Sequence, residues 1–60
     1  MQRHDKVIII NAKHNPALLR AGISKGDLAR ITTWHSNLHC GNAYIYKLGL
    51  IMPVTSENII

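Results

Sequence analysis

A single cysteine in a chain of only 60 residues is the feature that most limits what this sequence can fold into. A domain of this size buries only about 60% of the surface that its unfolded chain exposes, so its core is marginal. Small scaffolds usually gain stability from a disulfide, a metal ion, a second subunit or unusually good packing. Cys40 has no second cysteine to pair with in the chain. A metal or a second chain is therefore the expected support, and one unpaired thiol fits a reducing compartment.

The composition narrows the class of protein further. Hydrophobic residues make up 47% of the chain, which is too many for a disordered protein. The longest apolar run, Val7–Ile10, is far shorter than the roughly 20 residues of a membrane span, and too short for the core of a signal peptide. No repeat or linker interrupts the sequence. We therefore expect one cytoplasmic domain over residues 1–60, with no membrane partner.

The charge balance points to an anionic partner. The chain contains seven lysines and arginines and three acidic residues, which gives a formal net charge of +4. A basic balance in so small a domain favours nucleic acid or an acidic protein surface as the partner.

The first third of the chain predicts a strand followed by a helix. The β-branched run Lys6–Asn11 is typical of a short strand that is covered on both faces or paired along at least one edge. Asn15 and Pro16 predict a helix start, because Asn caps free backbone N–H groups and Pro suits the first helical position. Good helix formers follow as far as Ala21, and Gly22 can adopt the left-handed conformation that closes a helix.

A second helix is expected after Ser24–Asp27. This segment has the S-x-x-D form of a capping box, in which both side chains satisfy free N–H groups of the first turn. Leu28, Ile31 and then Trp34 or His35 recur at helical spacing. Two β-branched threonines between them weaken the end of this helix.

The third segment, Ser36–Leu48, is compatible with two structures. A helix here would begin at a capping Ser or Asn and end at Gly49, with its apolar residues on one face. Gly41 would cost such a helix about 1 kcal/mol relative to Ala. In a β structure, Gly41 and Asn42 would form a turn and the β-propensity of Tyr44–Tyr46 would favour a strand. We favour the helix, and the choice between helix and strand for Tyr44–Leu48 stays open.

The last residues predict a small C-terminal hairpin. Leu50–Val54 is extended in character, and Pro53 belongs on an edge strand. A turn-forming segment separates this run from the apolar pair Ile59 and Ile60, and the hairpin could pair with Lys6–Asn11. The expected fold is therefore mainly α with minor β: a helix-turn-helix core of three short helices, an N-terminal strand and a C-terminal hairpin.

Three places in this order of elements resemble the winged helix-turn-helix family of DNA-binding domains. Gly22-Ile23-Ser24 followed by Leu28-Ala29-Arg30 looks like the supporting helix of that family. Ser36-Asn37-Leu38 looks like the start of its recognition helix, and Leu48-Gly49-Leu50-Ile51 looks like the passage to the wing. The resemblance covers about half of the chain.

The resemblance implies a small DNA-binding transcriptional regulator. Polar residues on the third helix would reach base edges, while lysine and arginine side chains would contact phosphates and fix the register. Because the cations are few, one copy should bind weakly, so a homodimer on two half-sites is expected. The predicted nucleic-acid-binding residues are Lys25, Arg30, Ser36, Asn37, His39, Asn42 and Lys47.

A metal site and an enzyme are both disfavoured. His35 and His39 are four residues apart and would share one face of a helix, next to Cys40. On that helix, however, Cys40 points about 100° away from His39, and no CxxC or CxxH pair supports zinc binding. Cysteine and histidine could also form a nucleophilic pair, but so short a chain has little room for a substrate pocket. We expect no metal, no cofactor and no enzymatic activity.

A protein-binding module is the alternative function. Trp34, Tyr44 and Tyr46 form an aromatic cluster of the kind that anchors protein interfaces. A small basic domain of this sort could dock on a larger host protein and inhibit or recruit it. In size and style it is similar to the small regulators that phages and mobile elements encode.

Overall fold

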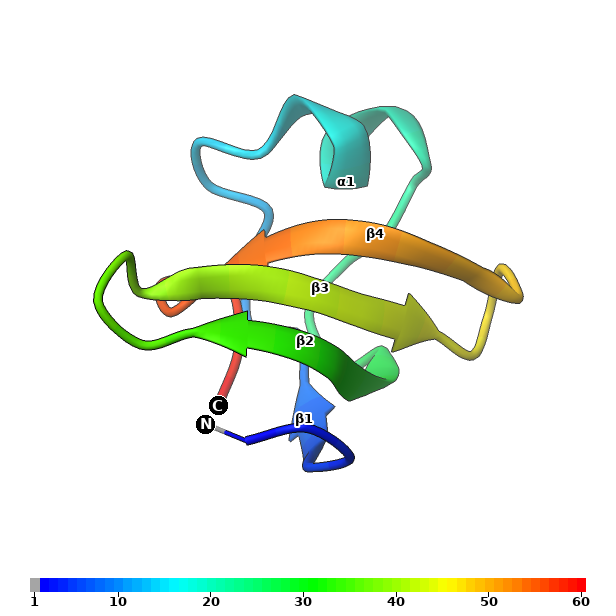
Figure 1. The fold of residues 1–60 in the computed structure, drawn as a ribbon. Helices are drawn as coiled ribbons and strands as arrows, with labels where there is room; N and C mark the ends of the chain where they lie inside the picture. The colour runs from blue at the N-terminus through cyan, green and yellow to red at the C-terminus, as the bar shows by residue number, and fades with distance from the viewer. Residues whose placement is uncertain (1) are drawn as a thin grey trace.

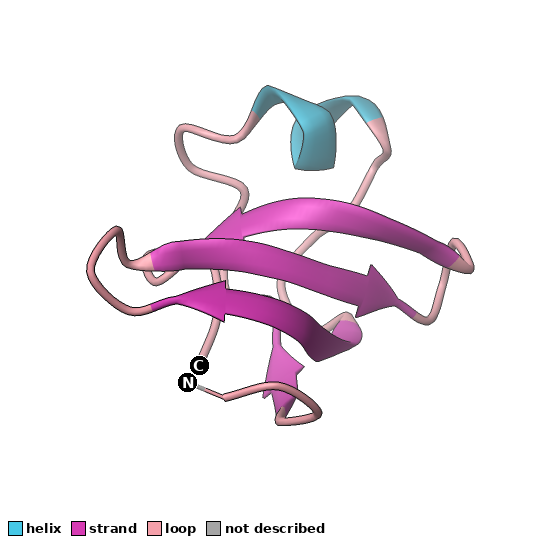
Figure 2. Ribbon diagram, in the orientation of Figure 1, coloured by secondary structure: helices cyan, strands magenta, loops and turns pink. Residues whose placement is uncertain are grey.

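The computed structural model of the protein describes residues 2–60, and its framework is a four-stranded antiparallel sheet with one short helix (Figures 1 and 2). The strands follow one another in the order β1-β2-β3-β4, so each pairs with its neighbour in the sequence. The helix lies beside β4, at the edge of the sheet (Figure 1). The elements are β1 (Lys6–Ile8), α1 (Pro16–Arg20), β2 (Leu28–His35), β3 (Cys40–Ile45) and β4 (Leu50–Thr55).

The C-terminal residues close the sheet against β1. The N–H of Ile8 donates to the carbonyl of Ile60 at 3.1 Å, and the N–H of Ile60 donates back to Ile8 at 3.0 Å. Ile9 and Ile59 form a further antiparallel bridge. β1 is therefore paired on both sides, with β2 and with the C-terminal segment. Because only a short turn separates β4 from this segment, the sheet curls back toward its own first strand.

The core is aliphatic and alternates large and small side chains. Across β2 and β3 the inward pairs are Ile31 with Ala43 and Ala29 with Ile45, so each isoleucine faces an alanine. All four side chains are fully buried. Such complementary sizes fill the space between strands without overpacking. The buried core consists of Val7, Ile9, Leu18, Ile23, Ala29, Ile31, Ala43, Ile45, Val54 and Ile59.

Asn58 joins four segments through its buried side chain. Its Oδ1 accepts hydrogen bonds from Asn15 Nδ2 at 3.0 Å and from the N–H and the hydroxyl of Thr55 at 3.0 and 3.1 Å. Its Nδ2 donates to the carbonyl of Lys13 at 3.0 Å and to Asn11 Oδ1 at 3.3 Å. The side chain has no exposed surface, so these bonds replace all of its contacts with water.

The helix predicted at Pro16 is confirmed. Asn15 Oδ1 accepts a hydrogen bond from the N–H of Leu18 at 3.3 Å, and Pro16 occupies the first helical position. Gly22 follows the helix with a φ of +73°, the left-handed conformation expected of it. Asn15 Nδ2 also donates to the carbonyl of Pro53 at 2.8 Å, so the same side chain caps α1 and ties it to β4.

The mainly helical fold class, and with it the helix-turn-helix core, is wrong. The expected second helix is strand β2, whose buried side chains are Ala29 and Ile31, with Trp34 half-buried. A bulge between Ile31 and Thr33 shifts the register with β3. This extra residue breaks the period of two and moves the next inward side chain to Trp34. Ile31 and Trp34 therefore have helical spacing in the sequence although the chain is extended, whereas Leu28 lies on the exposed face of the strand.

The capping-box pattern at Ser24–Asp27 belongs to a turn. The N–H of Ser24 donates to Asp27 Oδ2 at 2.9 Å, as in a capping box, but a strand follows in place of a helix. Gly26 has a φ of +100°, and its N–H donates to the carbonyl of Ile9 at 2.8 Å. The carbonyl of Asp27 accepts from the N–H of Ile9 at 2.8 Å. Pairing with the end of the first strand thus overrides the local preference for a helix.

The expected third helix over Ser36–Leu48 is also wrong. This segment forms the turn 36–39, strand β3 and most of the turn 46–49. A Cβ on Gly41 would overlap the backbone carbonyl of Thr33 and lie 2.9 Å from the Trp34 indole. Only glycine permits the two strands to approach in this way. Gly41 and Asn42, which the β alternative placed in a turn, therefore lie within β3.

The outcome at the two ends of the chain is mixed. The strand expected at Lys6–Asn11 is present as β1, with its bridge at Ile9, and its expected pairing along at least one edge is confirmed. Alternate residues are exposed, so it is not covered on both faces. The position of Pro53 on an edge strand is confirmed. The C-terminal hairpin is wrong, because β4 pairs with β3 and only the last residues join β1. Within residues 2–60, the five-residue α1 falls well short of a membrane span.

Replacing Asn58 by Ala should strongly destabilise the fold. The change leaves the Thr55 N–H and the Lys13 carbonyl without these partners, and Asn15 Nδ2 keeps only its bond to the carbonyl of Pro53. Each unsatisfied buried group costs about 1–3 kcal/mol. We expect a loss of at least about 3 kcal/mol in urea unfolding, against a total of about 3–9 kcal/mol for this length. Asn37→Ala, in an exposed turn, is the control and should stay within about 0.5 kcal/mol. A change below about 1 kcal/mol in Asn58→Ala would contradict the role of this network.

Replacing Gly41 by Ala should destabilise the β2–β3 pair. The new methyl group meets backbone atoms, which cannot move aside, so we expect a cost of about 3 kcal/mol. The change can be followed as a lower Tm by circular dichroism and by Trp34 fluorescence. Asn42→Ala is the control, because its side chain is on the opposite face of the same strand. Equal Tm values for the two variants would show that the strands can separate at this point at little cost.

Candidate functional site

One row of side chains crosses the outward face of the sheet. The antiparallel register places Lys6 opposite Arg30, Arg30 opposite Tyr44, and Tyr44 opposite Ile51. Side chains directly opposite one another in such a sheet have Cβ atoms about 4.5–5.5 Å apart. Lys6 and Arg30 are exposed, and Tyr44 is half-buried. The row therefore presents two cations beside an aromatic ring, with an exposed apolar side chain at its end.

A second aromatic ring packs against this row. The centroids of the Tyr44 and Tyr46 rings are 5.5 Å apart, and their planes meet at 76°. Edge-to-face pairs of this kind are favourable and hold each ring in a defined orientation. Tyr46 remains 46% exposed. The sheet thus holds two oriented aromatic rings at its surface, next to Arg30.

Asn42 continues the outward face toward the β2–β3 turn. It stands two residues before Tyr44 on β3 and opposite Pro53 on β4. Its backbone carbonyl accepts a hydrogen bond from the hydroxyl of Thr32 at 3.3 Å, across the bulge of β2. Within residues 2–60 its side-chain amide has no hydrogen-bond partner. That amide is free to donate and to accept a bond from a ligand.

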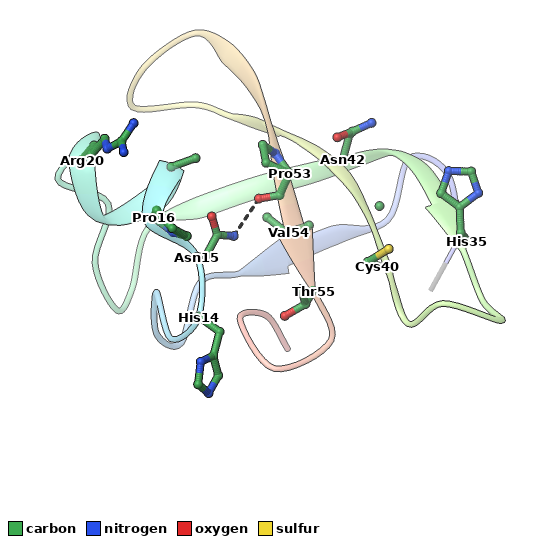
Figure 3. Close-up of a pocket in the computed structure, with 12 residues that line it drawn as sticks. His14, Asn15, Pro16, Arg20, His35, Cys40, Asn42, Pro53, Val54 and Thr55 are labelled. Atoms are coloured by element: carbon green, nitrogen blue, oxygen red, sulfur yellow. Dashed lines mark hydrogen bonds between the residues drawn. The ribbon is translucent and has the colours of Figure 1, made fainter.

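A shallow groove of about 640 Å³ lies where this face meets α1 (Figure 3). Pro53 of β4 lies between the two walls in this view, with Pro16 and Arg20 of α1 on one side and Asn42 and Cys40 of β3 on the other. No carboxylate is among the residues that line the groove. Its full lining is His14, Asn15, Pro16, Ala17, Arg20, His35, Cys40, Gly41, Asn42, Pro53, Val54 and Thr55.

A second hollow lies at the other edge of β2, beside the N-terminal residues. It has a volume of about 520 Å³ and is lined by Gln2, Arg3, Thr32, Thr33 and Trp34. The N–H of His4 donates to the carbonyl of Ile31 at 2.7 Å, which holds this N-terminal segment against β2. Trp34 packs against the core while also bordering the hollow.

The sequence-predicted nucleic-acid-binding residues do not form one surface. Arg30 and Asn42 both face outward, on neighbouring strands. Lys47 lies in the turn at the other end of β3, where its Nζ donates to the carbonyl of Gly22 at 3.5 Å. Lys25 lies in the loop that precedes β2. The remaining three residues form most of the β2–β3 turn: Ser36, Asn37 and His39.

Sequence reasoning missed Lys6 and Arg20. It named Tyr44 and Tyr46 only as anchors of a protein interface and not among the nucleic-acid-binding residues. The alternation of Cys40–Ile45 was the available signal, because a strand places every second residue on one face. The strand alternative would have brought the two tyrosines together. Lys6 could be added only after its register with Arg30 was known.

The histidines and the cysteine do not assemble as a metal centre. In residues 2–60, no three His, Cys, Asp or Glu side chains gather where they could hold a metal ion. His35 and Cys40 are opposite one another in the β2–β3 register. His39 lies in the adjoining turn with a φ of +54°.

Comparison of the chain with models of protein families, with curated protein sequences and with solved structures finds no match.

Proposed function

We propose that this protein binds single-stranded nucleic acid on the outward face of its sheet. The observation that carries the proposal is the row of Lys6, Arg30 and Tyr44, with Tyr46 packed at the side of Tyr44. Proteins that bind single strands combine cations that follow the backbone with aromatic rings on which bases stack. A sheet surface offers both at fixed spacing.

A single strand suits this face better than a duplex. The bases of a duplex are stacked on one another, whereas those of a single strand are free to stack on aromatic side chains. Tyr44 belongs to β3 and Tyr46 begins the turn that follows it, and within residues 2–60 no helix is long enough to serve as a recognition helix. Stacking on such a ring contributes about 1–3 kcal/mol per base. Two rings can therefore supply a substantial part of the affinity.

The modest number of cations favours two copies on one strand. Lys6 and Arg30 are the two cations in the row that crosses the outward face beside Tyr44, so a single copy should bind weakly at moderate salt. Linking two weak sites raises the overall affinity without any new contact. We therefore propose a homodimer, and a regulatory role in which the protein occupies a transcript or an unwound DNA segment.

Binding can be measured by fluorescence anisotropy with a labelled single strand of about 10 nucleotides, which is within the length that one small sheet domain occupies. Tyr44→Ala should raise the Kd about tenfold or more, because it removes a stacking platform. Tyr44→Phe keeps the ring and should retain most of the affinity. Arg30→Gln should weaken binding and reduce the slope of log K against log salt by about 0.7.

Lys47→Gln is the matched control for Arg30→Gln. It removes the same charge at the far end of β3, away from the central row, and should change the affinity less. Absence of binding by the unaltered protein at about 50 mM salt would contradict the proposal, since phosphate contacts dominate under that condition.

Docking of a protein is the second candidate function, and one observation favours it. Ile60, Ile8 and Leu28 are neighbours across three chain segments on the outward face. Their exposed fractions are 72%, 43% and 56%. Adjacent exposed apolar side chains of this kind mark interaction surfaces. A second copy of the chain is the occupant that also suits the proposed homodimer, and a larger host protein is the alternative.

Ile60→Asp should weaken self-association if this apolar row joins two copies. A charge placed in an apolar interface loses its hydration, so we expect the dimer Kd to rise at least about tenfold in analytical ultracentrifugation. Leu38→Asp is the control, because Leu38 is 64% exposed in the β2–β3 turn. If the unaltered protein is a monomer at every concentration, the homodimer is contradicted. The apolar row would then be a surface for a different protein.

A further inference from the structure

The groove beside α1 has the size and the walls of a site for a small organic group. Its volume of about 640 Å³ lies within the range of about 300–1,000 Å³ that is usual for small-molecule sites. Pro53 of β4 and Pro16 of α1 provide apolar surface (Figure 3), and Ala17 of α1 also lines the groove. The position of α1 is fixed by Asn15, whose Nδ2 donates to the carbonyl of Pro53 at 2.8 Å. The two walls therefore keep their spacing.

The groove is continuous with the proposed nucleic-acid-binding face. Asn42 lines the groove and also stands two residues from Tyr44 on the same face of β3. Residues two apart in a strand are about 6.6 Å apart, so a ligand on Tyr44 reaches the groove in one short step. A single strand that stacks on Tyr44 is therefore led toward Pro53.

The charges around the groove suit a polyanion. Arg20 of α1 lies at one end, and His14 and His35 also contribute to the lining (Figure 3). Lys6 and Arg30 lie on the outward face beyond Tyr44. Arginine binds phosphate through two parallel N–H bonds, which makes it well suited to a phosphate at the mouth of the groove. Since no carboxylate lines the groove, nothing there repels that phosphate.

We infer that the groove receives one unpaired base of the bound strand, with its phosphate toward Arg20, and that Asn42 makes this position selective for adenine. The inference rests on the proposed function. The flat base lies against Pro53, Pro16 and Ala17. The Asn42 amide has a donor and an acceptor side by side, and this pair matches the N7 acceptor and the N6 donor of adenine.

Cys40 provides a direct measure of occupancy. It is the only cysteine in the chain and it lines the groove. We would measure the rate at which an aromatic disulfide reagent modifies this thiol in the unaltered protein. A saturating oligothymidine strand that carries one adenine should slow the reaction several-fold. The same strand without the adenine should protect the thiol less and bind more weakly.

Two variants separate the groove from the rest of the face. Asn42→Ala should abolish the preference for adenine, so that oligothymidine strands with and without the adenine bind alike. Ala17→Phe fills the groove and should have the same effect through exclusion of the base. Leu19→Phe is the matched control, because Leu19 is on the exposed side of the same helix, with 65% of its surface exposed. Circular dichroism of each variant checks that the sheet is intact.

The outcomes distinguish this inference from the proposed function. Strands that bind without slowing Cys40 modification, or an adenine preference that survives in Asn42→Ala, would overturn the inference and leave the proposed function standing. Protection of Cys40 by an acidic peptide but by no oligonucleotide would overturn it in favour of a protein ligand. If no strand binds the unaltered protein, the proposed function and the inference fail together.

Discussion

The buried amide of Asn58 is the interaction on which the other parts of this structure depend. It holds the loop between β1 and α1, the cap of α1, the end of β4 and the C-terminal residues in one network of hydrogen bonds. A chain of this length has a marginal core and no disulfide. Polar networks in a core give a unique arrangement when every member is satisfied. Here that arrangement also fixes α1 against Pro53, through Asn15, and so shapes the groove.

Local chemistry was enough to predict some elements, and long-range pairing decided the others. The start of α1 could be read at Asn15 and Pro16, because a cap and a proline act within one turn. The row of Lys6, Arg30 and Tyr44 could not be predicted from the sequence, because Lys6 and Arg30 become neighbours only through the register of β1 with β2.

Gly41 has a local propensity that disfavours a strand, whereas the packing of the folded chain requires a glycine in this strand. In isolation a glycine weakens a helix and a strand alike. In the folded chain its missing side chain lets β3 approach the backbone of Thr33 and the indole of Trp34. That approach allows Trp34 to cover the core beside the bulge. The sequence pattern shows that a glycine weakens regular secondary structure at this position. It does not show that the backbone of Thr33 and the indole of Trp34 approach too closely for any other residue.

The placement of the aromatic residues connects stability with function. Aromatic side chains bury more area than aliphatic ones, so a chain with a marginal core would gain stability by placing them inside. This core is built from isoleucine, alanine, valine and leucine, and both tyrosines are on the outward face. Between β2 and β3 the inward pairs are isoleucine with alanine, and the one aromatic side chain packed against the core, within residues 2–60, is Trp34 beside the bulge. The sheet therefore keeps its stability in tight aliphatic packing and leaves its two tyrosine rings available, beside Arg30, for a ligand on the outward face.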